Sequence, residues 1–312
     1  MVFPSASGCL AELLYRAMSR PPFCHLFRLW YLKRRLLPRS HFILFPTFRC
    51  DYYGRCPYCH LLDMGFPRLY PEDLPVEKAV DSFLRFSDSE LDVSGGEPFL
   101  WRGIREFVEE VGKENRVGVT TNLSWEVERE REWLSGFSSI TASYHPEAVG
   151  LEEFLKKVVL LRSIHPKVKV NVVAYPPLLH RVGEAVERFR REGIFVHVDP
   201  YLSPLSPYTK GEREWVRLLL VSKRKVEFPP AGLKKCDAGR RHFVVLPDGS
   251  VYTCWNGCML EHLLGPSVLG RSYRLGNLLE GTFSPLREEL ECWLPCSAGC
   301  DLDYVKQRPI TG

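Results

Sequence analysis

The sequence predicts an α/β protein built on a parallel sheet, followed by a smaller C-terminal unit of a different kind. Six strand-like apolar runs between residues 41 and 198 alternate with stretches of helical periodicity. Strands separated in this way form parallel sheets with right-handed crossovers. Near the other end, two β runs flank the turn Pro247-Asp248-Gly249, which predicts a β-hairpin. Periodicity alone leaves open whether the parallel sheet is flat or closed.

The predicted elements follow one another in regular order. Strands are expected at residues 41–47, 90–94, 116–122, 139–145, 167–175 and 194–198. Helices are expected at residues 71–86, starting with Pro71-Glu72-Asp73, and at 101–114, 125–134, 151–164 and 179–192. A proline-containing bridge, residues 203–235, holds one further helix at 212–221 and leads to the hairpin.

Length and composition are those of a globular enzyme. The 312 residues can bury one large core and a small second one, and 45% hydrophobic with 26% charged residues excludes disordered and fibrous classes. The eleven cysteines fall mainly within residues 50–59 and 236–300. Such short spacings, without a secretory leader, favour metal ligation over disulfides and predict a reducing cytoplasm.

Three of these cysteines form a compact array directly after the first predicted strand. Cys50, Cys56 and Cys59 have the spacing C-x5-C-x2-C, and no fourth cysteine occurs in the following hundred residues. Three thiolates can hold three corners of a [4Fe-4S] cluster and leave the fourth iron open. A zinc site with His60 as the fourth ligand is equally compatible with the array by itself.

A second motif, Gly95-Gly96-Glu97-Pro98, ends the second predicted strand. Alone it predicts an ordinary turn at a strand end. Together with the cysteine array it resembles the radical S-adenosylmethionine (SAM) superfamily, whose members carry a three-cysteine loop after the first barrel strand and a GGEP-type motif after the second. One departure is the gap of five residues between Cys50 and Cys56, where most of the family has three.

The resemblance implies a partial (βα)6 TIM-like barrel, residues 41–202, with its active site at the C-terminal ends of the strands. It implies that Cys50, Cys56 and Cys59 hold a [4Fe-4S] cluster with an open iron site. SAM would bind there and be cleaved reductively to a 5′-deoxyadenosyl radical, which abstracts hydrogen from a substrate. Tyr58 falls where the family places an aromatic ring beside the adenine.

Further cofactor contacts are expected around this loop. Gly95 and Gly96 lack a Cβ and let the backbone approach the methionyl end, while Glu97 is expected to accept a hydrogen bond from its ammonium group. Polar residues at the other strand ends are either cofactor or substrate contacts or solvated rim residues. These are Asn122, Ser143, Tyr144, His145, Asn171 and Asp199.

The C-terminal region, residues 236–312, resembles the SPASM/twitch extension of radical SAM maturases. The resemblance rests on Cys236 and Gly249-x4-Cys254, then Leu275-Gly276-Asn277-Leu278, then Cys292-x3-Cys296-x3-Cys300. Six thiolates cannot fill two cubanes, so one auxiliary [4Fe-4S] cluster is expected. The expected ligands are Cys236, Cys254, Cys296 and Cys300, which leaves Cys258 or Cys292 spare. A zinc ribbon is the alternative.

The first 40 residues form a basic extension, with seven Arg or Lys residues against a single Glu12. Charges interrupt every apolar run, which predicts neither a signal peptide nor a membrane span. Residues 26–37 predict a basic amphipathic helix. A helix that closes the bottom of the barrel is favoured over one that contacts anionic lipid, nucleic acid or an acidic peptide.

These features together predict a radical SAM enzyme that oxidatively modifies a peptide or small molecule, with a reductant such as ferredoxin or flavodoxin. No Walker loop or dinucleotide fingerprint occurs in the sequence. The alternative is a non-catalytic iron–sulfur or zinc protein, an electron carrier or scaffold that binds a partner through its basic extension. The sequence does not indicate the oligomeric state.

Overall fold

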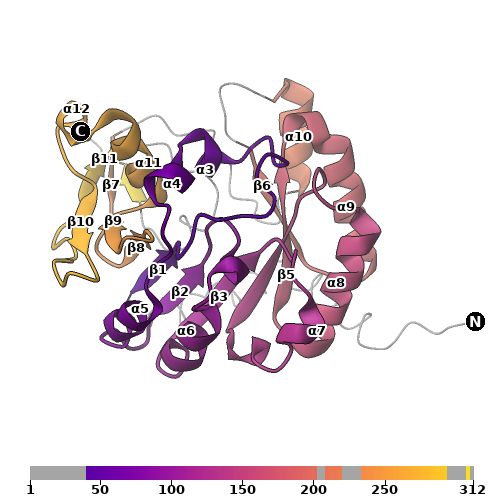
Figure 1. Cartoon of the computed structure of the whole chain (residues 1–312). Coiled ribbons are helices and arrows are strands. Elements are labelled where there is room, and N and C mark those ends of the chain that lie inside the picture. Colours follow the sequence, from indigo (N-terminus) through magenta and orange to yellow (C-terminus); the bar gives the residue numbers. More distant parts are fainter. Residues whose placement is uncertain (1–39, 202–207, 220–232, 294–306, 310–312) are drawn as a thin grey trace, which may run out of the picture.

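The computed structural model describes residues 40–201, 208–219, 233–293 and 307–309. Within them the main sheet has nine strands in the order β10-β9-β8-β1-β2-β3-β4-β5-β6 (Figure 1). The six strands of the barrel are β1 (His41–Leu44), β2 (Glu90–Val93), β3 (Arg116–Thr121), β4 (Ser139–Tyr144), β5 (Val168–Ala174) and β6 (Val196–Pro200). Each pairs in parallel with the next, as predicted. The α/β fold class is therefore confirmed.

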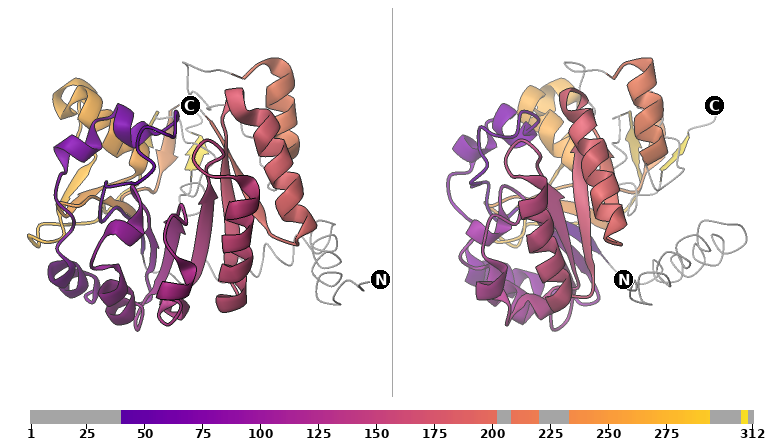
Figure 2. Two further views of the ribbon diagram at one scale, coloured as in Figure 1. Left: turned by 45° about the vertical axis from the view of Figure 1, so that its right-hand side comes forward. Right: turned by 90° about the vertical axis from the view of Figure 1, so that its right-hand side faces the viewer.

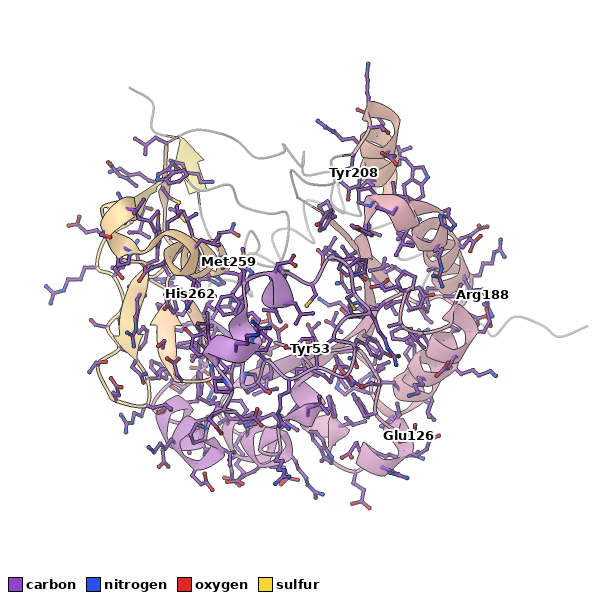
Figure 3. All side chains as sticks on the ribbon, turned by 45° about the horizontal axis from the view of Figure 1, so that its top comes forward. Tyr53, Glu126, Arg188, Tyr208, Met259 and His262 are labelled. Carbon is purple, nitrogen blue, oxygen red and sulfur yellow. The ribbon has the colours of Figure 1, made fainter. Side chains whose placement is uncertain are left out.

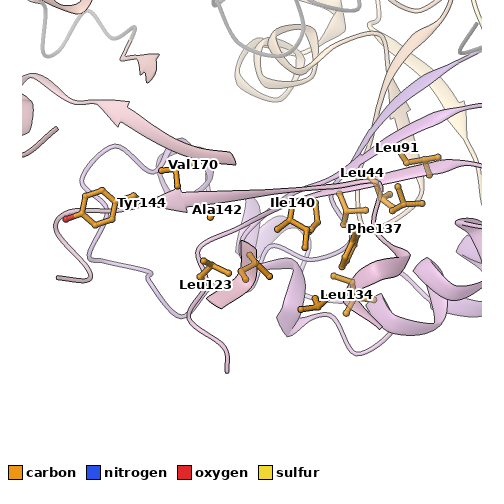
Figure 4. Close-up of a cluster of buried hydrophobic side chains, with 14 of the residues drawn as sticks. Leu44, Leu91, Leu123, Leu134, Phe137, Ile140, Ala142, Tyr144 and Val170 are labelled. Atoms are coloured by element: carbon orange, nitrogen blue, oxygen red, sulfur yellow. The ribbon is translucent and has the colours of Figure 1, made fainter. Parts of the chain in front are cut away.

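Helices cover the outer face of this parallel sheet (Figures 1 and 2). They are α5 (Val76–Phe83), α6 (Ile104–Val111), α7 (Val127–Glu130), α8 (Leu151–Ile164), α9 (Leu179–Arg191) and α10 (Lys210–Leu219). Alternate strand residues, among them Leu44, Leu91 and Ile140, point into the layer between sheet and helices and are fully buried (Figure 4). This layer is the main core, and it fixes the strand ends at which the site lies.

Three predicted helices are shorter than expected, and one of them, predicted at residues 101–114, covers only α6. The helix predicted from Pro71 begins at Val76, because a proline at position 75 lacks an N–H and clashes with the preceding turn when it is inside a helix. The helix predicted over residues 125–134 shrinks to α7, followed by a 3₁₀ turn at Leu134–Gly136. Its sequence carries like charges four residues apart, Glu126 with Glu130 among them, which destabilises a longer helix.

The C-terminal region extends the barrel sheet, which periodicity did not predict. Strand β8 (His242–Val245) pairs in parallel with β1, β9 (Ser250–Tyr252) forms the predicted hairpin with β8, and β10 (Arg274–Asn277) pairs with β9. A second sheet has the order β11 (Leu290–Cys292), β7 (Lys234–Cys236), β12 (Gln307–Pro309). Helices α11 (Trp255–Leu264) and α12 (Pro266–Leu269) lie beside the short helices α3 (His60–Asp63) and α4 (Phe66–Leu69) (Figure 1). The division at residue 236 stays a prediction, and the sheet is continuous across it.

The basic extension, with the helix predicted at residues 26–37, lies outside the described residues. Among the helices that the structure does describe, none combines the length and the apolar character needed to cross a bilayer.

Candidate active site

A cavity of about 1070 Å³ opens at the C-terminal ends of the barrel strands. Loops that follow parallel strands meet at one edge of a sheet, which explains why motifs far apart in the sequence line the same space. Predicted site residues on its wall are Cys50, Cys56, Tyr58, Cys59, Gly95, Gly96, Asn122, Ser143, His145 and Asp199. Tyr144, Glu97 and Asn171 do not line it.

The cysteine array lies on the loop between β1 and α3. All three thiols are half-buried, and Cys50 Sγ accepts a hydrogen bond from Tyr52 N at 3.4 Å. Burial raises the pKa of Cys50 to about 12 and also raises the pKa values of Cys56 and Cys59. The thiols therefore hold their protons in the free protein, and a metal centre must displace them on binding.

The three thiols by themselves do not make up a site for a single ion. Ligands of one zinc ion sit about 2.3 Å from the metal and so lie close to one another. In the described part of the chain, Cys50, Cys56 and Cys59 do not form a set within 4.8 Å of one another. A cubane spreads its ligands over different iron atoms and suits wider spacing. Only these three of the described cysteines line the cavity, so the residues fit a [4Fe-4S] cluster with one open iron.

Gly95 and Gly96 bring the end of β2 into direct contact with the cysteine loop. Gly95 has φ +132°, and a Cβ there would lie 2.4 Å from the carbonyl oxygen of Thr47. A Cβ on Gly96 would lie 2.0 Å from the carbonyl oxygen of Arg49. Both glycines also line the cavity. Both positions therefore require glycine because two backbone segments cross here at close range, which the sequence did not show.

Glu97 is fully buried and binds groups of the protein itself. Its carboxylate accepts hydrogen bonds from Phe99 N at 3.1 Å, Thr121 Oγ1 at 2.8 Å and Asn122 N at 2.7 Å. Burial raises its pKa to about 7, against the opposing effect of these hydrogen bonds. Glu97 thus ties the end of β2 to the end of β3. Its contact with the ammonium group of a cofactor stays a prediction.

Asn122 connects β3 to the cysteine loop. Its side-chain amide donates a 2.9 Å hydrogen bond to Asp51 and lies 3.8 Å from Cys50 Sγ. Ser143 reaches the cavity from β4, whereas Asn171, its partner on β5, does not line the cavity and helps to lower the pKa of Asp199. Some of the predicted cofactor residues therefore line the cavity, and the others lie behind the residues that line it.

Tyr58 belongs to an aromatic wall that it shares with residues from other strands. Its hydroxyl lies 3.0 Å from His145 Nδ1, and the two rings stack with centroids 6.0 Å apart. The ring of Tyr175 lies 5.4 Å away. A carboxylate oxygen of Glu147, which the sequence analysis did not select, lies 3.8 Å from His145 Nδ1. The sequence signal that could have identified Glu147 was its position just after the fourth predicted strand.

The C-terminal cysteines occupy different surroundings. Cys236, Cys258 and Cys292 are buried in a second hydrophobic core, and Cys254 caps α11 by accepting a 3.3 Å hydrogen bond from Gly257 N. Cys236 lies in β7 and not in the hairpin, because the turn around Gly239 separates β7 from β8. Of the predicted auxiliary ligands, Cys236 therefore lies outside the hairpin of β8 and β9, and Cys254 follows its second strand at the start of α11. Cys296 and Cys300 lie outside the described residues, and the auxiliary cluster stays a prediction.

Comparison with known proteins supports the fold. No family model and no curated protein matches the sequence. Among solved structures, anSMEcpe with bound AdoMet has a TM-score of 0.52 at 15% identity, covering 78% of this chain and 76% of that one. Streptococcus suis SuiB bound to its precursor peptide SuiA has a TM-score of 0.53 at 14% identity, covering 81% and 67%. The likeness supports the predicted α/β fold with its partial barrel of parallel strands. At these identities the likeness concerns the fold.

Proposed function

We propose that this protein is a radical SAM enzyme that oxidatively modifies a peptide or small molecule. The observation that carries the proposal is the meeting of Cys50, Cys56 and Cys59 with Gly95 and Gly96 on one cavity wall at the strand ends. When bound, the [4Fe-4S] cluster supplies the electron that cleaves SAM into methionine and a 5′-deoxyadenosyl radical.

The protein's own residues would position the reactants. Tyr58 offers an aromatic face for the adenine. His145 holds the Tyr58 side chain in place through a hydrogen bond to its hydroxyl and through ring stacking. Glu97 N donates a hydrogen bond to Arg49 O, and the Asn122 side-chain amide donates one to Asp51 Oδ1, so the two residues fix the chain on either side of Cys50. Such hydrogen bonds hold the loop residues of the site in fixed positions.

A peptide substrate has support from the fold neighbours. Both anSMEcpe, in a complex with AdoMet and the Cp18Cys peptide, and SuiB, with SuiA, have structures that contain a peptide. The cavity here exceeds the usual upper size of about 1,000 Å³ for small-molecule pockets, which leaves room for a substrate beside SAM. A reductant such as ferredoxin or flavodoxin would deliver the electron.

The test is anaerobic reconstitution with iron and sulfide, followed by addition of dithionite and SAM. We expect close to one open [4Fe-4S] cluster per barrel and formation of 5′-deoxyadenosine in stoichiometric or greater amounts. A protein fully loaded with iron that forms no 5′-deoxyadenosine would contradict the proposal.

A zinc-binding protein is the second candidate, and one observation favours it. Cys56, His145 and Glu147 place one ligand atom each within 4.8 Å of the others, which is the spacing of a single ion with an open position. Metal analysis of protein purified without oxygen separates the two candidates. Tightly held zinc that is lost in His145→Ala, with no iron bound at Cys50 or Cys59, would favour the second.

A further inference from the structure

Helix α11 turns an apolar stripe towards the cavity. Trp255, Met259 and Leu263 are four residues apart, so they lie on one face of the helix, and all three line the cavity. On the adjacent side of the helix, Cys258 is buried in the second core, against which Trp255 and Met259 also pack. The stripe therefore lies at the border between this core and the cavity, where its exposed surface is available to a ligand.

The stripe is anchored at one end and open at the other. The ring of Trp255 packs 4.7 Å from that of Phe45 and 5.4 Å from that of Phe66, next to the cysteine loop. Leu263, two turns further on, is 63% exposed. Met259 lies between them, and its flexible thioether adapts to differently shaped apolar groups. The exposed end of the stripe is therefore the part that a ligand would cover.

Another part of the cavity wall comes from β6, α10 and residues beside them. It includes the polar side chains of Asp199 and Arg213 together with Pro200, Tyr201 and Tyr208. His197 lies 2.9 Å from Asp199 and, despite burial, keeps the pKa of that carboxyl low, so Asp199 is ionised. Figure 3 shows Met259 and Tyr208 on opposite sides of the region that contains Tyr53. A ligand between these walls meets hydrocarbon on one side and the charged groups of Asp199 and Arg213 on the other.

We propose that the α11 stripe is the specificity subsite for an apolar side chain of a peptide substrate. The peptide's backbone amides and carbonyls would face Asp199 and Arg213 across the cavity. A peptide combines an apolar side chain with hydrogen-bonding groups on one short segment, as the two walls require. The inference rests on the proposed radical SAM function, which it deepens by naming the substrate class and the residues that select it.

The test uses the reconstituted full-length protein with SAM present and three capped pentapeptides, Gly-Gly-X-Gly-Gly, with X as Leu, Phe or Asp. Affinities are measured by isothermal titration calorimetry. We expect the wild type to bind the Leu and Phe peptides about tenfold or more tightly than the Asp peptide, because burying such a side chain is worth about 1.5–3 kcal/mol. In Leu263→Glu this preference should disappear.

Leu264→Glu is the matched control. Leu264 is the next residue of the same helix, is 46% exposed, and does not line the cavity. This variant should keep both the peptide preference and the wild-type rate of SAM cleavage. Thermal unfolding of both variants checks that neither has lost its fold.

The outcomes separate the subsite from the proposed function. Equal binding of the three peptides by the wild type, no peptide binding, or the same loss in both variants would overturn the subsite. Saturation by a free amino acid or nucleotide in place of the peptides would also overturn it. If the peptide preference holds and depends on Leu263 while no 5′-deoxyadenosine is formed, the proposed function fails and the subsite stands.

Discussion

The two groups of cysteines in this chain occupy opposite kinds of environment. Cys50, Cys56 and Cys59 lie on an irregular loop, are half-buried, and line a cavity. Of the described C-terminal cysteines, Cys236, Cys258 and Cys292 are enclosed in the second core, and Cys254 is half-buried at its edge. Cysteine side chains therefore have two different surroundings in this chain, which suit two different purposes. Access to a cavity allows an exchangeable ligand at a metal centre, whereas burial shields a thiol or a metal from solvent.

The two environments are in contact. Cys59 and Cys254 both pack against the second core, and Trp255 bridges the cysteine loop and α11. The C-terminal region therefore completes the site as well as extending the sheet. The following predictions test whether the two cysteine groups act separately.

The largest effect is expected from replacing Cys50, Cys56 and Cys59 together by alanine. The open cluster would be lost, and 5′-deoxyadenosine formation should fall at least about a thousandfold, because the cofactor performs the bond cleavage. Iron analysis should show a loss of about four irons per chain with the C-terminal iron retained. Continued 5′-deoxyadenosine formation under dithionite would refute the assignment of the cluster.

Cys236→Ser tests the enclosed group. The wild type should hold about eight irons, four for each cluster, and the variant should lose about four of them while the Mössbauer spectrum of the open cluster persists. Cys258→Ala, which changes a predicted spare thiol, is the matched comparison. A well-loaded wild type with about four irons and tightly bound zinc would instead support a zinc ribbon in the C-terminal region.

The third prediction concerns pH and the buried Glu97. Its pKa is about 7 in the folded protein and about 4.5 when unfolded, so the folded state binds the extra proton between these values. The contribution of Glu97 to the free energy of unfolding should therefore be largest below about pH 4.5. It should fall by about 3 kcal/mol as the pH rises through 7.

Chemical unfolding of the wild type and Glu97→Gln between pH 5 and 8 measures this effect. The glutamine variant should lack this part of the pH dependence, because its amide does not titrate. Parallel pH profiles for the two proteins would show that Glu97 is ionised throughout the range.

A smaller effect is expected on cofactor affinity. Glu97→Ala should weaken SAM binding by about ten- to a hundredfold, equivalent to about 1.5–3 kcal/mol, through loss of a charge-assisted hydrogen bond. Equilibrium dialysis with the reconstituted protein measures it. Thr121→Val removes one donor to Glu97 without touching the carboxylate and serves as the control. Unchanged SAM affinity in Glu97→Ala would limit Glu97 to its structural role between β2 and β3.

Much of the barrel could be predicted from the sequence, because local patterns carry it. Helix α8 follows the predicted bounds, and all six barrel strands lie within or near theirs. The misses were also local in cause. Pro75 delays α5, and clustered charges shorten α7. Such effects are readable in a sequence once the strength of a helix breaker is weighed against hydrophobic spacing.

The site was predictable where one short segment holds its chemistry. The spacing of Cys50, Cys56 and Cys59 and the adjacent glycines could be read directly. The partners of Glu97 could not, because Thr121 and Asn122 lie 24 and 25 residues further along the chain, at the end of another strand. The stripe on α11 was equally hidden, since nothing in a helix sequence shows which face borders a cavity.

The sequence by itself determined the parallel α/β architecture, the cysteine loop and the presence of a C-terminal hairpin, because each depends on residues close together in the chain. Only the tertiary structure decided that the hairpin joins the barrel. His41 pairs with His242 across 201 positions, with 2.8 Å between their Nδ1 atoms, and His41 also contacts Asp92 at 3.0 Å. Which distant strands pair depends on the packing of the whole core, and that packing places α11 beside the cysteine loop.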